Sequence, residues 1–436
     1  MVNYKLLKSL VLPGGAVLAV AALLLETGVP PLSNSAVDFY YYAIFCAGIL
    51  LALRFHSNRT LFTMLTLLLA HRALGFFSVG RSLNYGAGHI AFEVIAFLLP
   101  LNFLLFSYIQ ERGFTLPALT PYLALVFLES IVVALLCRPA AKSSPALFHA
   151  AYLSHSLFAW SQVPQFGLFS FVAAALLLAY RFFHFQQPLE AGFFWSLIAT
   201  FASFQKGSIH AEGTAYAATA GLILLSSIIE NSYVLAYHDE LTLLPGRRAF
   251  NTALLRLEPP YTIAVVDIDH FKRFNDTYGH DTGDQVLRLV AARLARVGGG
   301  GKAFRVGGEE FNIVFAGTKL QDALPHLEQL RAVVQNSSFR IREVPERRTT
   351  PRGSDRRGRT HKNAAKGKRA NSPGHTAGSL SVTVSIGVAE PTQQKDLVLQ
   401  VIECADKALY RAKQAGRNRV EVFRMIRASR AKRQSA

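Results

Sequence analysis

Hydrophobic residues follow two different patterns along this chain, and one gives way to the other near residue 237. Before that point, long apolar stretches alternate with short polar breaks. Each stretch is close to the roughly 20 residues that a helix needs to cross a bilayer. They predict eight membrane spans, at about 10–26, 36–54, 60–80, 88–109, 117–137, 164–185, 191–206 and 214–236. The seventh stretch is short, so a bundle of seven spans stays open as the alternative.

After residue 237 the apolar positions recur with the periods of strands and helices. A turn at Pro245-Gly246 precedes a first helix. The rest predicts an α/β (α+β) domain in the order β-α-α-β-β-α-β-α-β, with a mixed central sheet and surrounding helices. Strands are expected at 261–267, 302–306, 311–315, 380–388 and 419–423, and helices at 271–277, 284–297, 320–337 and 398–414.

Charge divides the chain at the same place. Residues 1–237 contain 11 Lys and Arg and 8 Asp and Glu, whereas residues 238–436 contain 35 and 20, so the net charges are +3 and +15. Sparse charge is typical of a membrane region, and the second part is long enough to bury one core. No convincing signal-peptide cleavage site follows the first apolar stretch. The three cysteines show no metal-binding spacing and no disulfide framework, which suits a reducing compartment.

Eight spans place both ends of the membrane region on one side. The basic residues give this weak support: Lys5, Lys8, Arg54, Arg59, Arg112 and Arg181 would lie inside, and Arg81, Arg138, Lys142 and Lys206 outside.

Four ionisable residues, His71, Arg72, Glu93 and Glu129, fall within the expected spans. Such residues are functional candidates by default, because a charge inside a bilayer is costly. The simpler alternative is that the span boundaries are shifted and the groups lie at interfaces. We favour that alternative for Arg72 and leave both open for Glu93 and Glu129. The sequence of this region indicates no ligand.

Acidic residues mark two places in the second part. Asp267 comes at the end of a β-branched strand, and Gly307-Gly308-Glu309-Glu310 forms a tight turn between two apolar runs. Adjacent acids on a hairpin are usually only a solvated turn. Together with a second acidic strand end, however, they can hold a divalent metal and a polyphosphate.

Five ordered motifs resemble the GGDEF diguanylate cyclases, and the match covers nearly all of residues 238–423 but none of the membrane region. In one-letter code the motifs are DxLTxLPxRR from Asp239, DIDHFKxxNDxxGHxxGD from Asp267, GGEEF from Gly307, VSIGVA from Val384 and ADxALYxAKxxGRN from Ala405.

The resemblance implies an enzyme that joins two GTP molecules into cyclic di-GMP and releases two pyrophosphates. One site would hold one GTP, so two protomers must meet as a homodimer. Mg²⁺ or Mn²⁺ would be held by Asp267, the Ile268 carbonyl, Glu309 and Glu310. Glu309, Glu310 and Lys272 are the expected catalytic residues, with Glu309 taken as the group that helps to activate the 3′-hydroxyl. The GTP-binding residues implied are Phe271, Asn275, His280, Asp284, Gly307, Gly308, Lys413 and Arg417.

Within that set, Asn275 and Asp284 would recognise guanine, because a carboxylate that accepts its edge N–H groups cannot be satisfied by adenine. Lys413 and Arg417 would contact the outer phosphates. The simpler interpretation of His280 is a structural role beside the base. Asp269 is expected only to cap or orient.

The chain departs from the family pattern in two places. Where many such cyclases have an inhibitory Arg-x-x-Asp, this chain has Gly298 and Gly301 in a run of four glycines. In addition, an insertion at about 343–378 is predicted to be disordered, and from Arg340 to Arg369 it has 12 Lys and Arg against 3 acids. The plainest interpretation is a solvated segment, and the alternatives are contact with anionic lipid headgroups or nucleic acid. Specific nucleic-acid recognition is not expected, because the segment lacks aromatic residues.

These observations predict a multi-span sensory and regulatory region at 1–236, a cyclase domain at 237–426 and a basic tail at 427–436. The expected protein is a diguanylate cyclase of a bacterial inner membrane, with its cyclase domain in the cytoplasm, and its partners are GTP, a second copy of the chain and the lipid bilayer. The alternative is a catalytically silent GGDEF domain that senses GTP or docks a partner.

Overall fold

The computed structural model describes residues 11–27, 33–78, 86–111, 113–138, 145, 148, 158, 160–340, 379–391 and 397–423. The chain forms two compact units, Met1–Val234 and Leu235–Ala436. The predicted insertion at 343–378 and the tail at 427–436 lie outside the described residues.

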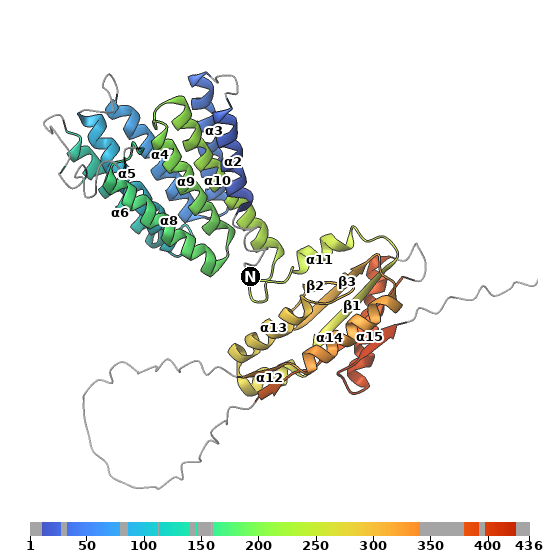
Figure 1. Cartoon of the computed structure of the whole chain (residues 1–436). Helices are drawn as coiled ribbons and strands as arrows, with labels where there is room; N and C mark the ends of the chain where they lie inside the picture. Colours follow the sequence, from blue (N-terminus) through green and yellow to red (C-terminus); the bar gives the residue numbers. More distant parts are fainter. Residues whose placement is uncertain are drawn as a thin grey trace, which may run out of the picture. The chain divides into compact units, whose positions relative to one another are not determined.

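The first unit is built of helices that pack along one another (Figure 1). A short π-helical turn, η1 (Val11–Gly15), leads into α2 (Ala16–Glu26). The helices that follow are α3 (Asn34–Arg54), α4 (Asn58–Ser78), α5 (Ala87–Tyr108), α6 (Leu116–Leu136), α8 (Gln165–Phe185), α9 (Pro188–Gln205) and α10 (Ala211–Tyr237).

The expectation of eight spans is supported only in part. Among the described residues, six helices are long and apolar enough to cross a membrane: α3, α4, α5, α6, α8 and α10. The first expected span is a shorter apolar helix at Leu12–Glu26, and the seventh, α9, is a helix that does not meet the same criterion. Each expected span is therefore helical, but the apolar length is clear for six.

Buried charges join three helices at one end of this unit. Arg181 at the end of α8 donates two hydrogen bonds, of 2.9 and 2.6 Å, to Glu190 at the start of α9, which is 1 % exposed. Arg59 at the start of α4 lies 3.4 Å from the same carboxylate. Because a buried carboxylate needs a compensating charge, this network fixes the ends of α4, α8 and α9 together. If successive helices cross the membrane in alternating directions, the start of α4, the end of α8 and the start of α9 all lie on the same side.

The second unit is a mixed sheet between two layers of helices (Figure 1). Its five strands run in the order β2-β3-β1-β6-β7. The central strand β1 (Tyr261–Ile268) pairs antiparallel with β3 (Glu310–Ala316) and β6 (Val384–Ala389). At the edges, β2 (Lys302–Arg305) pairs antiparallel with β3, and β7 (Val420–Phe423) pairs parallel with β6. The predicted mixed sheet is confirmed.

Side chains of β1 alternate between the two helical layers, as the period of a strand requires. Ala264, Val266 and Ile268 pack with α13 (His280–Leu294) and α14 (Leu320–Gln335). Ile263 and Val265 pack on the other face against α15 (Val398–Gln414). The remaining helices are α11 (Arg247–Leu254), which covers Phe304 and Val314, and α12 (Phe271–Tyr278).

Two element boundaries were wrong. The strand expected at 380–388 is divided into β5 (Ser379–Ser381) and β6, and β5 pairs with β4 (Ser338–Arg340) in a separate small sheet. The helix expected at 284–297 begins at His280 instead, because Gly279, with a φ of 82°, separates it from α12 and starts it one turn earlier.

Candidate active site

The carboxyl end of β1 brings together residues from three strands and one helix. Asp267 lies directly opposite Glu310 of β3 and opposite Ser385 of β6. It is only 5 % exposed, and Lys413 of α15 places its Nζ 2.9 Å from the Asp267 Oδ1. Directly opposite residues on paired strands have Cβ atoms about 5 Å apart. The pairing therefore sets the Asp267 and Glu310 carboxylates next to each other, and the Lys413 ammonium contacts that of Asp267.

The guanidinium group of Arg305 holds the turn between β2 and β3. Its Nη2 donates to the Gly308 carbonyl at 2.7 Å and its Nε to the Gly307 carbonyl at 3.2 Å. Its Nη1 donates to Asp239 at 2.7 Å. At Gly307 a Cβ atom would come within 2.8 Å of the Glu310 carboxylate, whereas Gly308 has open space where its Cβ would be. One guanidinium thus fixes the backbone that carries Glu309 and Glu310.

Electrostatics at this strand end favour an additional cation. Burial raises the pKa of Asp267; the hydrogen bond and charge of Lys413 oppose this, and Glu310 and Asp269 add to the rise. Burial also raises the pKa of Glu309, with contributions from Asp267 and Glu310. A raised pKa in a carboxyl group means that its ionised form lacks compensation.

The donor set suits a hard divalent ion, because Asp267, Glu309, Glu310 and the Ile268 carbonyl all offer oxygen. In the described part of the chain, however, no three His, Cys, Asp or Glu side chains are grouped closely enough to hold a metal as they stand. The ammonium of Lys413 occupies the Asp267 carboxylate instead. The chemistry of the residues fits Mg²⁺ or Mn²⁺, and the ligand set stays a prediction.

A second group of predicted residues lies where α12 meets α13. Asn275 is packed against Gly283 so closely that any Cβ at 283 would collide with its Oδ1, and Phe271 lies on the same side. The Asn275 Oδ1 is buried and has no hydrogen-bond partner. A buried acceptor without a partner is unfavourable. A hydrogen-bond donor that reached this atom would therefore be stabilising.

Four other predicted residues have side chains without an internal partner. Asp284, on α13 one position after Gly283, and Lys272 on α12 form no hydrogen bond or ion pair with the described residues, and the same holds for the side chains of His280 and Arg417. Their side chains are partly or fully exposed. They are available to a ligand.

Asp269 acts as an internal anchor. Its carboxylate accepts hydrogen bonds from Ser385 at 2.6 Å, from Thr383 at 2.7 Å and from the backbone N–H of Asn418 at 3.0 Å. The last bond holds the loop in which Arg417 and Asn418 both have positive φ. The orienting role expected for Asp269 agrees with these contacts.

Comparison with known sequences identifies the second unit. The family described as "Diguanylate cyclase, GGDEF domain" matches residues 236–354 and 357–419. The second unit is a GGDEF domain. The first unit, with its long apolar helices, precedes it in the chain and is outside that match.

Two curated relatives match a little under half of the chain. The chain is 33 % identical over 204 residues to the response regulator PleD of Caulobacter vibrioides, a match that covers 45 % of this chain and 38 % of PleD. It is 31 % identical over 194 residues to the diguanylate cyclase DosC of Escherichia coli, covering 43 % and 35 %. Matches to these relatives therefore span well under half of their length.

Among solved structures, the GGDEF domain of DgcB from Caulobacter crescentus in complex with c-di-GMP is 34 % identical to this chain. The match covers 44 % of this chain and 94 % of the DgcB domain, with a TM-score of 0.34.

The GGDEF domain differs from the family pattern at Gly298–Gly301, and the structure gives local reasons for Gly298, Gly299 and Gly300. The His326 ring of α14 packs so closely that a Cβ at Gly298 would come 2.7 Å from its Nδ1, and one at Gly299 would collide with the ring. Gly299 and Gly300 also have φ values of 65° and 74°. Side chains other than glycine are poorly accommodated in this loop.

Two relationships in the GGDEF domain were missed in the sequence. The clamp of Arg305 on Asp239 joins residues 66 positions apart, and the pair of Lys413 with Asp267 joins a helix to a strand end. The only signal was that Asp239 and Lys413 belong to motifs. Burial raises the pKa of Asp239, but the hydrogen bonds from Thr242 and Arg305 together lower it more. The Asp239 carboxylate therefore stays ionised as a partner for Arg305.

Proposed function

We propose that this protein is a membrane-bound diguanylate cyclase that condenses two GTP into cyclic di-GMP and two pyrophosphates. The single observation that carries the proposal is the opposition of Asp267 and Glu310 at the end of the central strand, within a GGDEF domain. Carboxylates that lack full compensation at that point suit a metal–triphosphate complex.

In this mechanism each domain binds one GTP and two domains face each other. Each 3′-hydroxyl attacks the α-phosphorus of the other nucleotide. In each of the two attacks a P–O bond forms, the bond to pyrophosphate breaks, and the hydroxyl proton leaves. Glu309 is proposed to take that proton, since it lies on the turn beside the strand end that carries Asp267 and Glu310. A bound Mg²⁺ or Mn²⁺, held by Asp267, Ile268, Glu309 and Glu310, would supply positive charge against the triphosphate.

Guanine recognition is assigned to the junction of α12 and α13. The unpartnered Asn275 Oδ1 and the Asp284 carboxylate are hydrogen-bond acceptors, and the edge of guanine offers N–H donors. Adenine has no matching donors, so the Asn275 acceptor would stay buried and unsatisfied. Phe271 and His280, which the motifs also assign to GTP binding, would form the rest of the guanine site.

Phosphate contacts are assigned to the cationic residues. Lys272 would neutralise charge that develops on the reacting phosphate, and Arg417 would bind outer phosphates from the loop that Asp269 holds. Lys413 donates to Asp267 and has further N–H groups with which it would bind the same outer phosphates. The turn at Gly307-Gly308 has no side chains to obstruct the nucleotide.

The setting of the reaction belongs to the same proposal. The six long apolar helices support a place in a bilayer, and use of GTP requires the GGDEF domain to be cytoplasmic, in a bacterial inner membrane. The catalytic form would be a homodimer, regulated through the membrane region. At constant GTP, we therefore expect the rate per chain to rise with protein concentration, and a constant rate across a wide dilution series would contradict the dimer requirement.

The decisive experiment uses the full-length protein in nanodiscs with GTP and Mg²⁺, followed by anion-exchange chromatography. A product that co-elutes with cyclic di-GMP is expected. Asp267→Ala and Glu310→Ala should each lower the rate to about one thousandth or less, because several kcal/mol of charge stabilisation are lost. Asp322→Ala on the exposed face of α14 is the matched control and should keep full activity.

A silent GGDEF domain would give a different result. Tight GTP binding without any dinucleotide product would establish the sensor alternative in place of the cyclase. Near-normal activity of either strand-end variant would show instead that the acidic site is wrongly assigned.

A further inference from the structure

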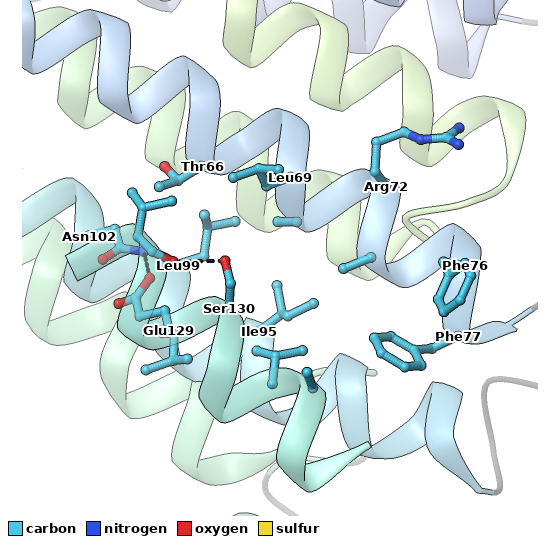
Figure 2. A pocket seen from close by; sticks show the side chains of 16 residues that line it. Thr66, Leu69, Arg72, Phe76, Phe77, Ile95, Leu99, Asn102, Glu129 and Ser130 are labelled. Atoms are coloured by element: carbon cyan, nitrogen blue, oxygen red, sulfur yellow. Dashed lines mark hydrogen bonds between the residues drawn. The ribbon is translucent and has the colours of Figure 1, made fainter. Parts of the chain in front are cut away.

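A cavity of about 400 Å³ opens between α4, α5 and α6 of the membrane unit. Figure 2 shows its lining, which is mostly apolar, with Asn102 and Glu129 at one end and Arg72 at the other. The apolar walls come from Leu69, Phe76, Phe77, Ile95, Leu98, Leu99, Val126 and Val133. Cavities of this size and character are typical of small-molecule sites.

The polar end is formed by Asn102 of α5 and Glu129 of α6. The Asn102 Nδ2 donates to Glu129 Oε2 at 2.6 Å. Asn102 is 3 % exposed, and its Oδ1 has no hydrogen-bond partner. Both residues lie at least six positions inside their helices, which corresponds to about 9 Å from the nearer helix end. A carboxylate at this depth is costly unless a cation compensates it.

The two hydroxyl groups at this end do not provide the missing donors. Thr66 donates its hydroxyl hydrogen to the Thr63 carbonyl, and Ser130 donates to the Val126 carbonyl. What they present to the cavity is therefore oxygen lone pairs. Among the described residues at this end, the Asn102 amide is the one group that donates to the Glu129 carboxylate, and the two hydroxyl groups add no further donor.

Arg72 does not neutralise the Glu129 carboxylate. It lies at the other end of the cavity, where Figure 2 shows its guanidinium turned away from Asn102 and Glu129. Its Nη1 donates to the Tyr42 hydroxyl at 3.0 Å. A cationic group that donates several hydrogen bonds is thus the complement that this end of the cavity lacks.

We propose that this cavity binds an apolar small molecule that carries a protonated primary amine. The ammonium group donates to the Glu129 carboxylate, and the apolar body fills the space between α4, α5 and α6. The ammonium charge compensates the Glu129 carboxylate, which the apolar lining cannot do. This inference is independent of the cyclase reaction, because it concerns binding to the membrane unit alone.

The test is equilibrium dialysis of the full-length protein in nanodiscs against 4-phenylbutylamine and its neutral counterpart 4-phenylbutan-1-ol, with uptake by empty nanodiscs subtracted. One amine bound per chain is expected, with the alcohol at least tenfold weaker. Glu129→Gln should weaken amine binding at least tenfold. Ala134→Phe, on the exposed side of α6, should fill the cavity and remove binding of both probes. Glu26→Gln, at the exposed end of α2, is the matched control and should bind as the unmodified protein does.

Three results would overturn the proposal: no saturable amine binding to the unmodified protein, equal binding of the alcohol, or unchanged amine binding in Glu129→Gln. If Glu129→Gln fails to fold, Ala134→Phe decides alone, and amine binding retained by that variant would place the probe in the lipid rather than in the cavity.

Discussion

Arg305 on β2 and Asp239, just before the first helix of the GGDEF domain, form an ion pair of 2.7 Å that supports the turn of the acidic hairpin. The same guanidinium holds the Gly307 and Gly308 carbonyls. The position of Glu309 and Glu310 therefore depends on a residue that itself has no expected contact with substrate.

From this clamp we predict that Arg305→Ala lowers the turnover number about 100-fold while the domain stays folded, because displacing reactive groups by about 1 Å is enough for such a loss. The free energy of unfolding should fall by about 1–3 kcal/mol, since Asp239 and two carbonyls lose a partner. Steady-state kinetics and thermal unfolding measure the two effects. Lys302→Ala, an exposed position on the same strand, is the control. Unchanged turnover in Arg305→Ala would mean that the hairpin is positioned by other contacts.

The contact of β6 with α15 leads to a second prediction. A Cβ atom at Gly387 would come 2.1 Å from the Ala405 carbonyl oxygen and from the Leu409 nitrogen, both of them backbone atoms that cannot rotate away. Gly387→Ala should therefore destabilise the domain by about 1–3 kcal/mol or more. Chemical denaturation of the full-length protein, monitored on the GGDEF domain, measures this. Gly246→Ala, whose Cβ would meet only ordinary contacts, should change stability little. Equal stability of both variants would argue against this close packing.

The raised pKa of Glu309 predicts a dependence of stability on pH. A carboxyl group whose pKa is higher in the folded than in the unfolded state favours folding most below its unfolded pKa, and that contribution is lost as pH rises through the folded value. In metal-free buffer, Glu309→Gln should accordingly be more stable than the unmodified protein near pH 8, and the difference should vanish below about pH 4. Melting temperatures measured with a chelator present across this range provide the test. A difference that grows as pH falls would reverse the sign and refute the argument.

The glycine loop predicts weak feedback by product. Gly298 and Gly301 offer neither a guanidinium to clamp phosphate nor a carboxylate, and the His326 ring occupies the space beside Gly298 and Gly299. Ordering four glycines around a ligand would also cost chain entropy. Cyclic di-GMP titrated against the initial rate at saturating GTP should therefore inhibit only weakly. Potent inhibition that GTP cannot overcome would reveal a second product site elsewhere in the chain.

Much of the GGDEF domain could be predicted from sequence, because local patterns determine it. The continuous apolar run from Ile263 to Val266 indicates a central strand that is buried on both faces. The two strands around Gly307-Gly308 can pair in only a few registers once that turn is fixed. The divided strand at 379–389 was missed, since β5 pairs with β4 across an insertion that carries no periodic signal.

The sequence by itself determined the two-part organisation, the mixed sheet and the identity of the acidic residues at the strand ends, because these depend on composition, periodicity and motif spacing. Only the tertiary structure decided which groups meet: Arg305 with Asp239, Lys413 with Asp267, and Asn102 with Glu129 around a cavity. The two residues of each pair lie 27 to 146 positions apart in the sequence. Contacts across such separations arise from packing of whole elements, so no local pattern in the chain records them.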